Sequence, residues 1–281
     1  MLVGLKHVID YAEEKNIAIG AFNMLTFECF VAVMDVAEKK QIPIILNHCQ
    51  LDEKWIKLDH IGPALIKLAE RSSIPVCVNL DHGQDLDYVK RALDIGFTSV
   101  MIDGSMLPCR ENIELTRKAV ALACSYGAGT EAEIGVLGVK EDGSSVSNGP
   151  QYTIPEEARA FVDATDVDVL AVAIGTTHGI YKGEPKLDLQ RLERIRELIQ
   201  RPIVLHGGSG LTEEMYRQAI DRGVRKINYY TYMSAAGLKA VNDAMPNKDF
   251  VYYHQVADLA TRAMREHVDW VTDIFYKLKD Q

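Results

Sequence analysis

One unit recurs along the whole sequence: a short apolar run with strand character, followed by a longer segment with helical spacing. Residues 169–174 (VLAVAI) are apolar on both faces and β-branched at intervals, which is typical of a parallel strand covered on both sides. Eight such runs are predicted as strands, at residues 17–22, 43–46, 76–80, 99–102, 129–132, 169–174, 203–205 and 224–228. They predict an α/β fold, a (β/α)8 TIM barrel, and the helical patterns of residues 233–244 and 256–279 add extra C-terminal helices.

The main alternative is a doubly wound open sheet, which also alternates strands and helices. The positions of the polar side chains favour the barrel, because active-site residues of such barrels gather on the face formed by the carboxyl ends of the strands. An open sheet would spread them along a crevice. The side chains that fall at predicted carboxyl ends are Asn23, Asp81, His82, Asp103, Glu133, His178, His206 and Asn228.

The whole chain is expected to form one domain. Its 281 residues fit one barrel, and an apolar fraction of 47% is ample for a core. The composition shows no break that would mark a boundary, and no internal repeat is found. Residues 138–150 are polar and glycine-rich, but strand–helix alternation resumes after them, so we interpret them as a loop and expect a single domain over residues 1–281.

Charge and cysteine content limit the partners and the compartment. A net charge of −9 without a long basic run argues against a general nucleic-acid binder. The first residues lack a signal-peptide layout, and no apolar run is long enough to span a membrane. The five cysteines are odd in number and include no Cys-x-x-Cys pair. These features predict a cytoplasmic protein with reduced thiols that binds neither nucleic acid nor membranes.

Three histidines occupy equivalent places in the pattern. His82, His178 and His206 each follow a predicted strand and have glycine beside them. Three neutral imidazoles can hold Zn²⁺ and leave a fourth position open, as in catalytic zinc sites. Each histidine alone could equally be a hydrogen-bonded core residue, but three at equivalent strand ends predict a shared metal site. His48 follows the second strand and borders the same face in this arrangement.

Two glycine-rich or hydroxyl-bearing turns follow the last two strands, at residues 206–210 (HGGSG) and 228–231 (NYYT). In (β/α)8 barrels these loops often cradle a phosphate with backbone N–H groups, and Ser209 and Thr231 can add hydroxyl donors. A glycine after a strand alone indicates only a turn. Asp81 is suited to proton transfer beside a metal-bound oxygen or to orienting an imidazole. Glu141, by its residue context alone, reads as a solvated loop charge.

Motifs along nearly the whole chain resemble the class II, zinc-dependent ketose-bisphosphate aldolases, whose members cleave fructose- or tagatose-1,6-bisphosphate. They are residues 80–83 (LDHG), 99–105 (SVMIDGS), 131–135 (EAEIG), 141–143 (EDG), 171–179 (AVAIGTTHG), 181–188 (YKGEPKLD) and 205–210 (LHGGSG). The resemblance implies a (β/α)8 barrel that forms a homodimer or homotetramer. It also implies a lyase of carbohydrate metabolism that releases dihydroxyacetone phosphate (DHAP) through a zinc-stabilised enediolate.

The resemblance also implies roles for particular residues. The zinc ligands fall on His82, His178 and His206, and the catalytic aspartate, which exchanges a proton with the C4 hydroxyl, falls on Asp81. Glu141 matches the loop glutamate that takes the α-proton of DHAP, so the resemblance replaces the solvated-charge interpretation. Asp103 and Glu133 match positions that hold an alternative or second metal. The residues expected around the substrate, with a monovalent cation (Na⁺ or K⁺) near its phosphate, are Asn23, Gly179, Lys182, Gly207, Gly208, Ser209, Asn228, Tyr229, Tyr230 and Thr231.

The chain departs from the family pattern on the aldehyde side. Tyr229 and Tyr230 occupy a motif that usually carries smaller residues, and Tyr232 follows it. Ser234 stands where bisphosphate-cleaving relatives often have Arg or Lys. We therefore expect a zinc aldolase whose aldehyde product is not glyceraldehyde 3-phosphate. The alternatives are a fructose- or tagatose-1,6-bisphosphate aldolase proper, a catalytically silent phosphosugar-binding paralogue, and a metal-dependent hydrolase on the same barrel.

Overall fold

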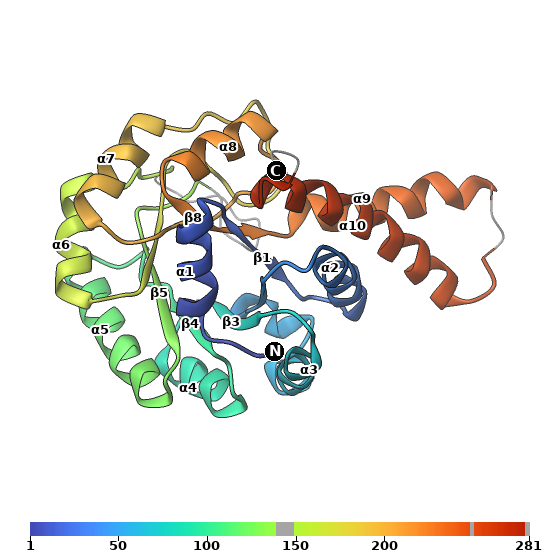
Figure 1. The fold of residues 1–281 in the computed structure, drawn as a ribbon, viewed down its shortest axis with the longest axis horizontal. Coiled ribbons are helices and arrows are strands. Elements are labelled where there is room, and N and C mark those ends of the chain that lie inside the picture. The colour runs from blue at the N-terminus through green and yellow to red at the C-terminus, as the bar shows by residue number, and fades with distance from the viewer. Residues whose placement is uncertain (139–148, 248–249, 279–281) are drawn as a thin grey trace.

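The computed structural model describes residues 1–138, 149–247 and 250–278. Eight parallel strands close into a barrel in the order β1 to β8, and helices surround it (Figure 1). The predicted (β/α)8 barrel with extra C-terminal helices is confirmed. The strands are β1 (Ile19–Asn23), β2 (Ile44–Cys49), β3 (Val76–Gly83), β4 (Ser99–Ile102), β5 (Gly129–Ile134), β6 (Val169–Val172), β7 (Ile203–Leu205) and β8 (Val224–Tyr229).

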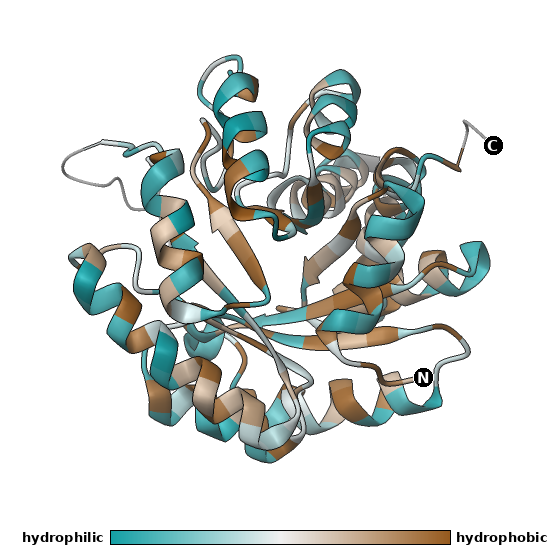
Figure 2. Ribbon diagram, turned by 60° about the vertical axis from the view of Figure 1, so that its left-hand side comes forward, coloured by the Kyte–Doolittle hydropathy of each residue, from teal (hydrophilic) through white to brown (hydrophobic). Residues whose placement is uncertain are grey.

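Helix α1 precedes β1, and at least one helix follows each strand. The helices are α1 (Leu5–Lys15), α2 (Phe27–Lys40), α3 (Leu58–Arg71), α4 (Leu86–Ile95), α5 (Cys109–Tyr126), α6 (Pro155–Thr165), α7 (Leu189–Ile199), α8 (Glu213–Asp221), α9 (Thr231–Ala244) and α10 (Tyr253–Phe275), with short 3-10 helices η1 (Gln50–Lys54) and η2 (Met245–Asn247). Hydrophobic residues concentrate on the strands, and the outward-facing parts of the helices are largely hydrophilic (Figure 2). The core therefore lies between the barrel and its helices.

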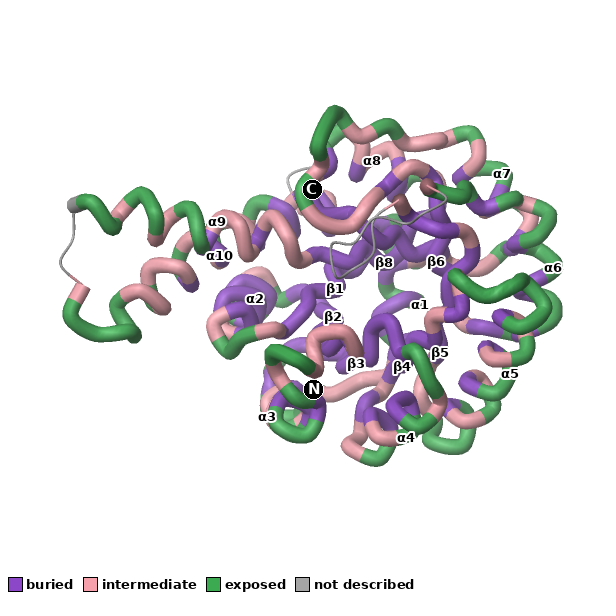
Figure 3. The backbone as a smooth tube through the Cα atoms, turned by 180° about the vertical axis from the view of Figure 1, so that it is seen from behind, coloured by how far each residue is buried: buried purple, intermediate pink, exposed green. Residues whose placement is uncertain are grey.

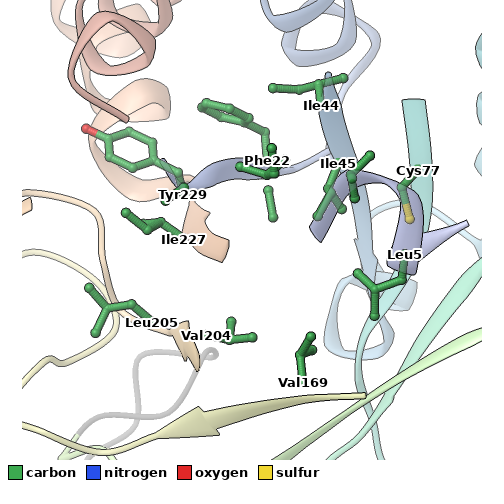
Figure 4. Packing of buried hydrophobic residues seen from close by; sticks show 14 of the residues in the cluster. Leu5, Phe22, Ile44, Ile45, Cys77, Val169, Val204, Leu205, Ile227 and Tyr229 are labelled. Carbon is green, nitrogen blue, oxygen red and sulfur yellow. The ribbon is translucent and has the colours of Figure 1, made fainter. Parts of the chain in front are cut away.

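The alternation of side chains along a strand explains how one strand contributes both to the hydrophobic core and to the polar candidate site. Successive side chains of a strand point to opposite faces. On β8 the apolar Ile227 and Tyr229 pack in the hydrophobic core, whereas Lys226 and Asn228 are buried among polar groups. Figure 4 shows the Tyr229 ring beside Phe22, which is its direct partner across the β1–β8 pair. On β8 the inner face is thus polar and the outer face apolar.

An asparagine row crosses three adjacent strands at the inner face. Asn23, Asn47 and Asn79 are direct neighbours in the β1–β2 and β2–β3 registers. All three are buried, and their amides form a hydrogen-bonded series from Asn79 to Asn47 (3.0 Å) and from Asn47 to Asn23 (3.4 Å). The row leads directly to the carboxyl end of β3, where the predicted site begins.

The helical spacing of residues 56–71, with Gly62-Pro63 within it, predicts a helix that is broken or kinked early. No break is found there, because α3 runs from Leu58 to Arg71 with Pro63 inside it. Proline lacks the N–H that would bond the carbonyl four residues earlier, which here belongs to Asp59 in the first turn. The loss falls near the helix start, and the buried apolar face of α3 outweighs it.

Helices α9 and α10 form an arm that extends beyond the barrel (Figures 1 and 3). Toward the barrel its residues are buried or half-buried, and toward the tip they are largely exposed (Figure 3). Large exposed side chains on or next to it include Leu238, Val251, Tyr252 and Tyr253. Of the helices that the structure describes, none combines the length and apolar character needed to cross a bilayer.

Candidate active site and metal centre

Three histidines meet at the carboxyl end of the barrel: His82 at the end of β3, and His178 and His206 in the loops after β6 and β7. The ring centroids of His82 and His206 lie 4.7 Å apart, those of His82 and His178 lie 5.4 Å apart, and those of His178 and His206 lie 6.2 Å apart. One nitrogen of each ring lies within 4.8 Å of the other two. This donor set fits a divalent metal, because Zn²⁺ accepts three imidazoles at about 2 Å each and keeps a position open for substrate.

The backbone at His82 makes this convergence possible. Asp81 and His82 are consecutive on β3 and would normally point to opposite faces of the strand. The φ angle of His82 is 45°, in the left-handed region, and the pairing with β4 shifts register between Leu80 and Gly83. Both side chains therefore enter the site. For a residue other than glycine such a conformation costs on the order of 1–3 kcal/mol, a cost that recurs at functional sites.

Two of the imidazoles, those of His82 and His206, are hydrogen-bonded to carboxylates. Asp103 Oδ2 lies 2.7 Å from His82 Nδ1, and Glu131 Oε1 lies 2.8 Å from His206 Nε2. The other nitrogen of His206, Nδ1, lies 3.1 Å from Glu133 Oε2, so this ring has a carboxylate at each nitrogen. Ligand histidines almost always have a partner of this kind, which fixes the tautomer and the ring orientation. The carboxylate partners of His82 and His206 therefore also fit a metal site.

The charges around His206 are tightly coupled. Burial alone would lower the pKa of His206, but the hydrogen bonds with Glu131 and Glu133 outweigh burial and raise that pKa to about 9. Burial would raise the pKa of Glu131, yet the Lys226 ammonium and His206 hold it at about 2. The hydrogen bond with His82 overcomes burial and holds the pKa of Asp103 well below its usual range. The site thus keeps these carboxylates ionised around the histidines.

Asp81 is buried in the middle of an amide clamp. Its Oδ1 accepts from Asn228 Nδ2 at 2.9 Å, and its Oδ2 accepts from Asn23 Nδ2 at 3.3 Å. Each carboxylate oxygen has more than one acceptor site, so both can still accept from a substrate hydroxyl. Asp81 is therefore fixed in orientation and keeps capacity for proton transfer.

A small pocket opens beside His178. Gly207 has a φ of 59°, and a Cβ there would lie 2.6 Å from the Thr177 carbonyl oxygen, so only glycine fits. Helix α9 begins at this pocket with Thr231, and the Tyr232 N–H donates to Ser209 Oγ at 2.9 Å. Helix N-termini and glycine-rich turns attract anions. The expected residues that line the pocket are Asn23, Gly179, Gly207, Ser209, Asn228, Tyr229, Tyr230 and Thr231.

Some expected residues lie elsewhere. The Tyr229 hydroxyl is 2.6 Å from His267 Nε2 on α10, so the phenol faces the outer helices although the residue borders the pocket. Gly208 packs against Ile227, and Lys182 is exposed. Glu141 lies outside the described residues. Asp103 and Glu133 form a group with His82 that could take a metal, as the resemblance implies.

The sequence reasoning missed two site residues, Glu131 and Lys226. Their side chains are fully buried, and Lys226 Nζ lies 2.7 Å from Glu131 Oε2. A charged residue two positions before an expected site residue was the available signal, since Glu131 precedes Glu133 and Lys226 precedes Asn228 on the same strand face.

Comparison with known proteins identifies the family. The profile of the class-II fructose-bisphosphate aldolases matches residues 3–279. A fructose-bisphosphate aldolase of Staphylococcus epidermidis is 37% identical over 257 residues, which cover 89% of this chain and 88% of the relative. The fructose-bisphosphate aldolase of Geobacillus stearothermophilus is 38% identical over 254 residues, with the same coverage.

The chain belongs to the class II fructose-bisphosphate aldolase family. It is therefore a class II ketose-bisphosphate aldolase, an aldehyde-lyase of carbohydrate metabolism, and the family implies a divalent metal and a sugar phosphate substrate. Among solved structures, the YdjI aldolase of Escherichia coli K12 is similar, with a TM-score of 0.86 and 29% identity over 98% of this chain and 97% of that chain. A fructose-1,6-bisphosphate aldolase described as putative, from Coccidioides immitis, has a TM-score of 0.86 and 30% identity over 96% and 95%.

Proposed function

We propose that this class II aldolase reversibly cleaves a ketose that carries a phosphate on C1, to DHAP and an aldehyde other than glyceraldehyde 3-phosphate. The observation that carries the proposal is the pocket beside His178, where Gly207, Ser209 and the start of α9 form one anion cradle next to the three histidines. A phosphate in this cradle would place the neighbouring carbonyl at the histidines. We place Gly179 and Thr231 in the same cradle.

Each group of site residues then has its own role in the reaction. His82, His178 and His206 would hold Zn²⁺, which supplies a Lewis acid for the substrate carbonyl when it is bound. Asp81 accepts the proton of the C4 hydroxyl during cleavage and returns it during condensation. The clamp of Asn23 and Asn228 keeps the carboxylate pointed at that hydroxyl. Glu141, which lies outside the described residues, is proposed to exchange the α-proton of DHAP.

The aldehyde side supports a product without a second phosphate. Tyr230 separates the cradle from a neighbouring pocket whose walls are mainly apolar, with Leu238, Val241 and Met264 among them. Ser234, at the position where relatives often carry a cation, lines that pocket as well. A largely apolar wall that also includes the acidic Glu28 gives a phosphate dianion little compensation for lost hydration.

The second candidate is a fructose- or tagatose-1,6-bisphosphate aldolase proper, with glyceraldehyde 3-phosphate as the aldehyde. It is favoured by the relatives at 37% and 38% identity, which bear the name fructose-bisphosphate aldolase. The two candidates share every residue on the DHAP side. They differ in whether the part of the substrate near Ser234 and Tyr230 carries a second phosphate.

A cleavage screen tests the proposal. The purified protein, with and without added Zn²⁺, is given both hexose bisphosphates and a set of ketose 1-phosphates that lack a second phosphate. DHAP release is followed with a coupled dehydrogenase, and His178→Ala serves as the inactive control. The proposal expects a higher kcat/KM for a ketose 1-phosphate than for either bisphosphate. Efficient turnover of a bisphosphate would establish the second candidate, and no DHAP from any compound would reject both.

Further parts of the proposal follow from the family resemblance. We propose a monovalent cation, Na⁺ or K⁺, beside the phosphate cradle, and its test is the dependence of cleavage on these ions with tetramethylammonium as the control. A homodimer or homotetramer, a cytoplasmic location and a single domain over residues 1–281 stay predictions.

A further inference from the structure

Lys226 is a charged side chain in the interior of the barrel. It lies on β8, its relative exposure is 0%, and its Nζ is 2.7 Å from both Glu131 Oε2 and Asn228 Oδ1. A buried ion pair seldom stabilises a fold more than apolar residues of the same size would. Packing alone therefore gives no reason for a lysine at this position.

The chemistry of the ammonium group determines how Asn228 is oriented. An ammonium carries donors and no acceptor, whereas an asparagine amide presents a carbonyl oxygen at one end and an NH2 at the other. Because Asn228 Oδ1 faces Lys226, its Nδ2 must face the opposite way, where it donates to Asp81 Oδ1 at 2.9 Å. An inverted amide would place its oxygen against the carboxylate.

The other side of Asp81 is built differently. There the series runs from Asn79 through Asn47 to Asn23, which donates to Asp81 Oδ2. It begins at a neutral amide and not at a fixed charge. Of the two amides that hold Asp81, only Asn228 is thus oriented by a full charge, that of Lys226. The charge is buried, where electrostatic interactions are strong.

We propose that Lys226 is a positioning residue for aldol cleavage: it fixes the amide of Asn228 so that Asp81 is held toward the C4 hydroxyl of the substrate. The same ammonium holds Glu131, which lies behind His206. This inference rests on the proposed proton transfer by Asp81. It adds Lys226 as a residue that acts on the reaction through Asn228 without touching the substrate.

A double-mutant cycle on the zinc-loaded protein tests the inference. The proteins are the native chain, Lys226→Met, Asn228→Ala and the double variant, compared by kcat and KM for DHAP release and by zinc content. With Asn228 present, we expect Lys226→Met to lower kcat roughly 10- to 100-fold with little change in KM, as for a small misplacement of a catalytic group. In the Asn228→Ala background the same change should cost roughly twofold or less, because coupled residues are not additive. An equal loss of kcat in both backgrounds, or no loss with Asn228 present, would overturn the proposal.

Two further variants guard the interpretation. Lys226→Met leaves Glu131 as an unpaired buried charge, so if it fails to fold, Lys226→Met combined with Glu131→Gln replaces Lys226→Met in the cycle, because the amide oxygen can still accept from His206. Lys40→Met is the matched control, because Lys40 is a largely buried lysine outside the barrel that pairs with Asp273 at 2.6 Å. It should lower stability and leave kcat unchanged, and a similar fall of kcat in Lys40→Met would overturn the assignment.

Asp81→Ala separates this inference from the proposed function. If Asp81→Ala keeps its cleavage rate, the proton-transfer role fails and the positioning role fails with it. If Asp81→Ala loses cleavage but the cycle is additive, the proposed function stands and only the role of Lys226 is rejected.

Discussion

The two faces of β8 are both buried, but one is polar and the other apolar. Inside the barrel, Lys226 and Asn228 take part in a network of charged and amide groups that ends at Asp81. Outside, Ile227 and Tyr229 pack in the apolar core, where the Tyr229 ring lies 5.9 Å from that of Phe275 on α10. The side chains of the inner face form directional hydrogen bonds, and those of the outer face bury apolar area against their neighbours.

This difference teaches where stability and chemistry lie. Burial of large apolar side chains between barrel and helices supplies most of the driving force for folding. The buried polar interior costs desolvation and contributes less to the folded state. Substitutions inside should therefore change the reaction, and substitutions outside should change the free energy of unfolding.

The largest expected effect is inside. Asp81→Ala should lower kcat by about 10²- to 10⁴-fold, the range for loss of a general acid or base. The fold should persist, because the outer layer is untouched. Steady-state DHAP release and far-UV circular dichroism measure the two quantities. A variant with native kcat would break the assignment of chemistry to the inner face.

The matching change outside is Phe275→Ala. Phe275 is fully buried and its ring lies 5.0 Å from that of Tyr216. Its truncation should lower the free energy of unfolding by about 3–5 kcal/mol, measured by urea denaturation. kcat at low temperature should stay near the native value. A large fall in kcat without a fall in stability would contradict the separation of the two faces.

A buried histidine near the inner face makes stability depend on pH. Burial lowers the pKa of His48 from 6.5 to about 4, with its Nε2 2.9 Å from the Tyr88 hydroxyl. The unfolded chain therefore binds more protons than the folded one between these values, so stability falls as pH drops below 6.5. The contribution of His48 between pH 7 and pH 5 should be about 2 kcal/mol. Urea denaturation of the native protein and of His48→Gln measures it, and identical pH dependence in both would reject it.

The smallest effect tests the placement of Tyr229. Tyr229→Phe removes the hydroxyl that contacts His267 and keeps the ring in the core. We expect a loss of about 1 kcal/mol in the free energy of unfolding, as for one buried hydrogen bond. A clear rise in KM instead would show that the phenol reaches the substrate, and would return Tyr229 to the substrate-binding role expected from the sequence.

The sequence predicted the barrel because each strand is a separate apolar run and each helix has its own period. It also predicted which residues stand at the carboxyl ends of the strands, and the structure brings His82, His178 and His206 together there. Position along a strand is a local property, so local patterns were sufficient.

Other features depend on contacts between distant segments. Nothing near Lys226 in the sequence indicates that Glu131, from β5, faces it across the barrel. The left-handed backbone of His82 reverses the alternation that a strand pattern assumes. The same alternation, applied to β8, would have directed the Tyr229 phenol away from Asn228 and toward the helices.

The central claim is that His82, His178 and His206 together hold one divalent metal. The most direct measurement is the metal content of the purified protein by inductively coupled plasma mass spectrometry. It is made for the native chain and for the His82→Ala, His178→Ala and His206→Ala variants. The account predicts about one Zn²⁺ per native chain, its loss in each variant, and recovery of turnover when Zn²⁺ is returned to the stripped native protein. Variants that retain the full metal content, or a metal-free protein that keeps its turnover, would contradict it.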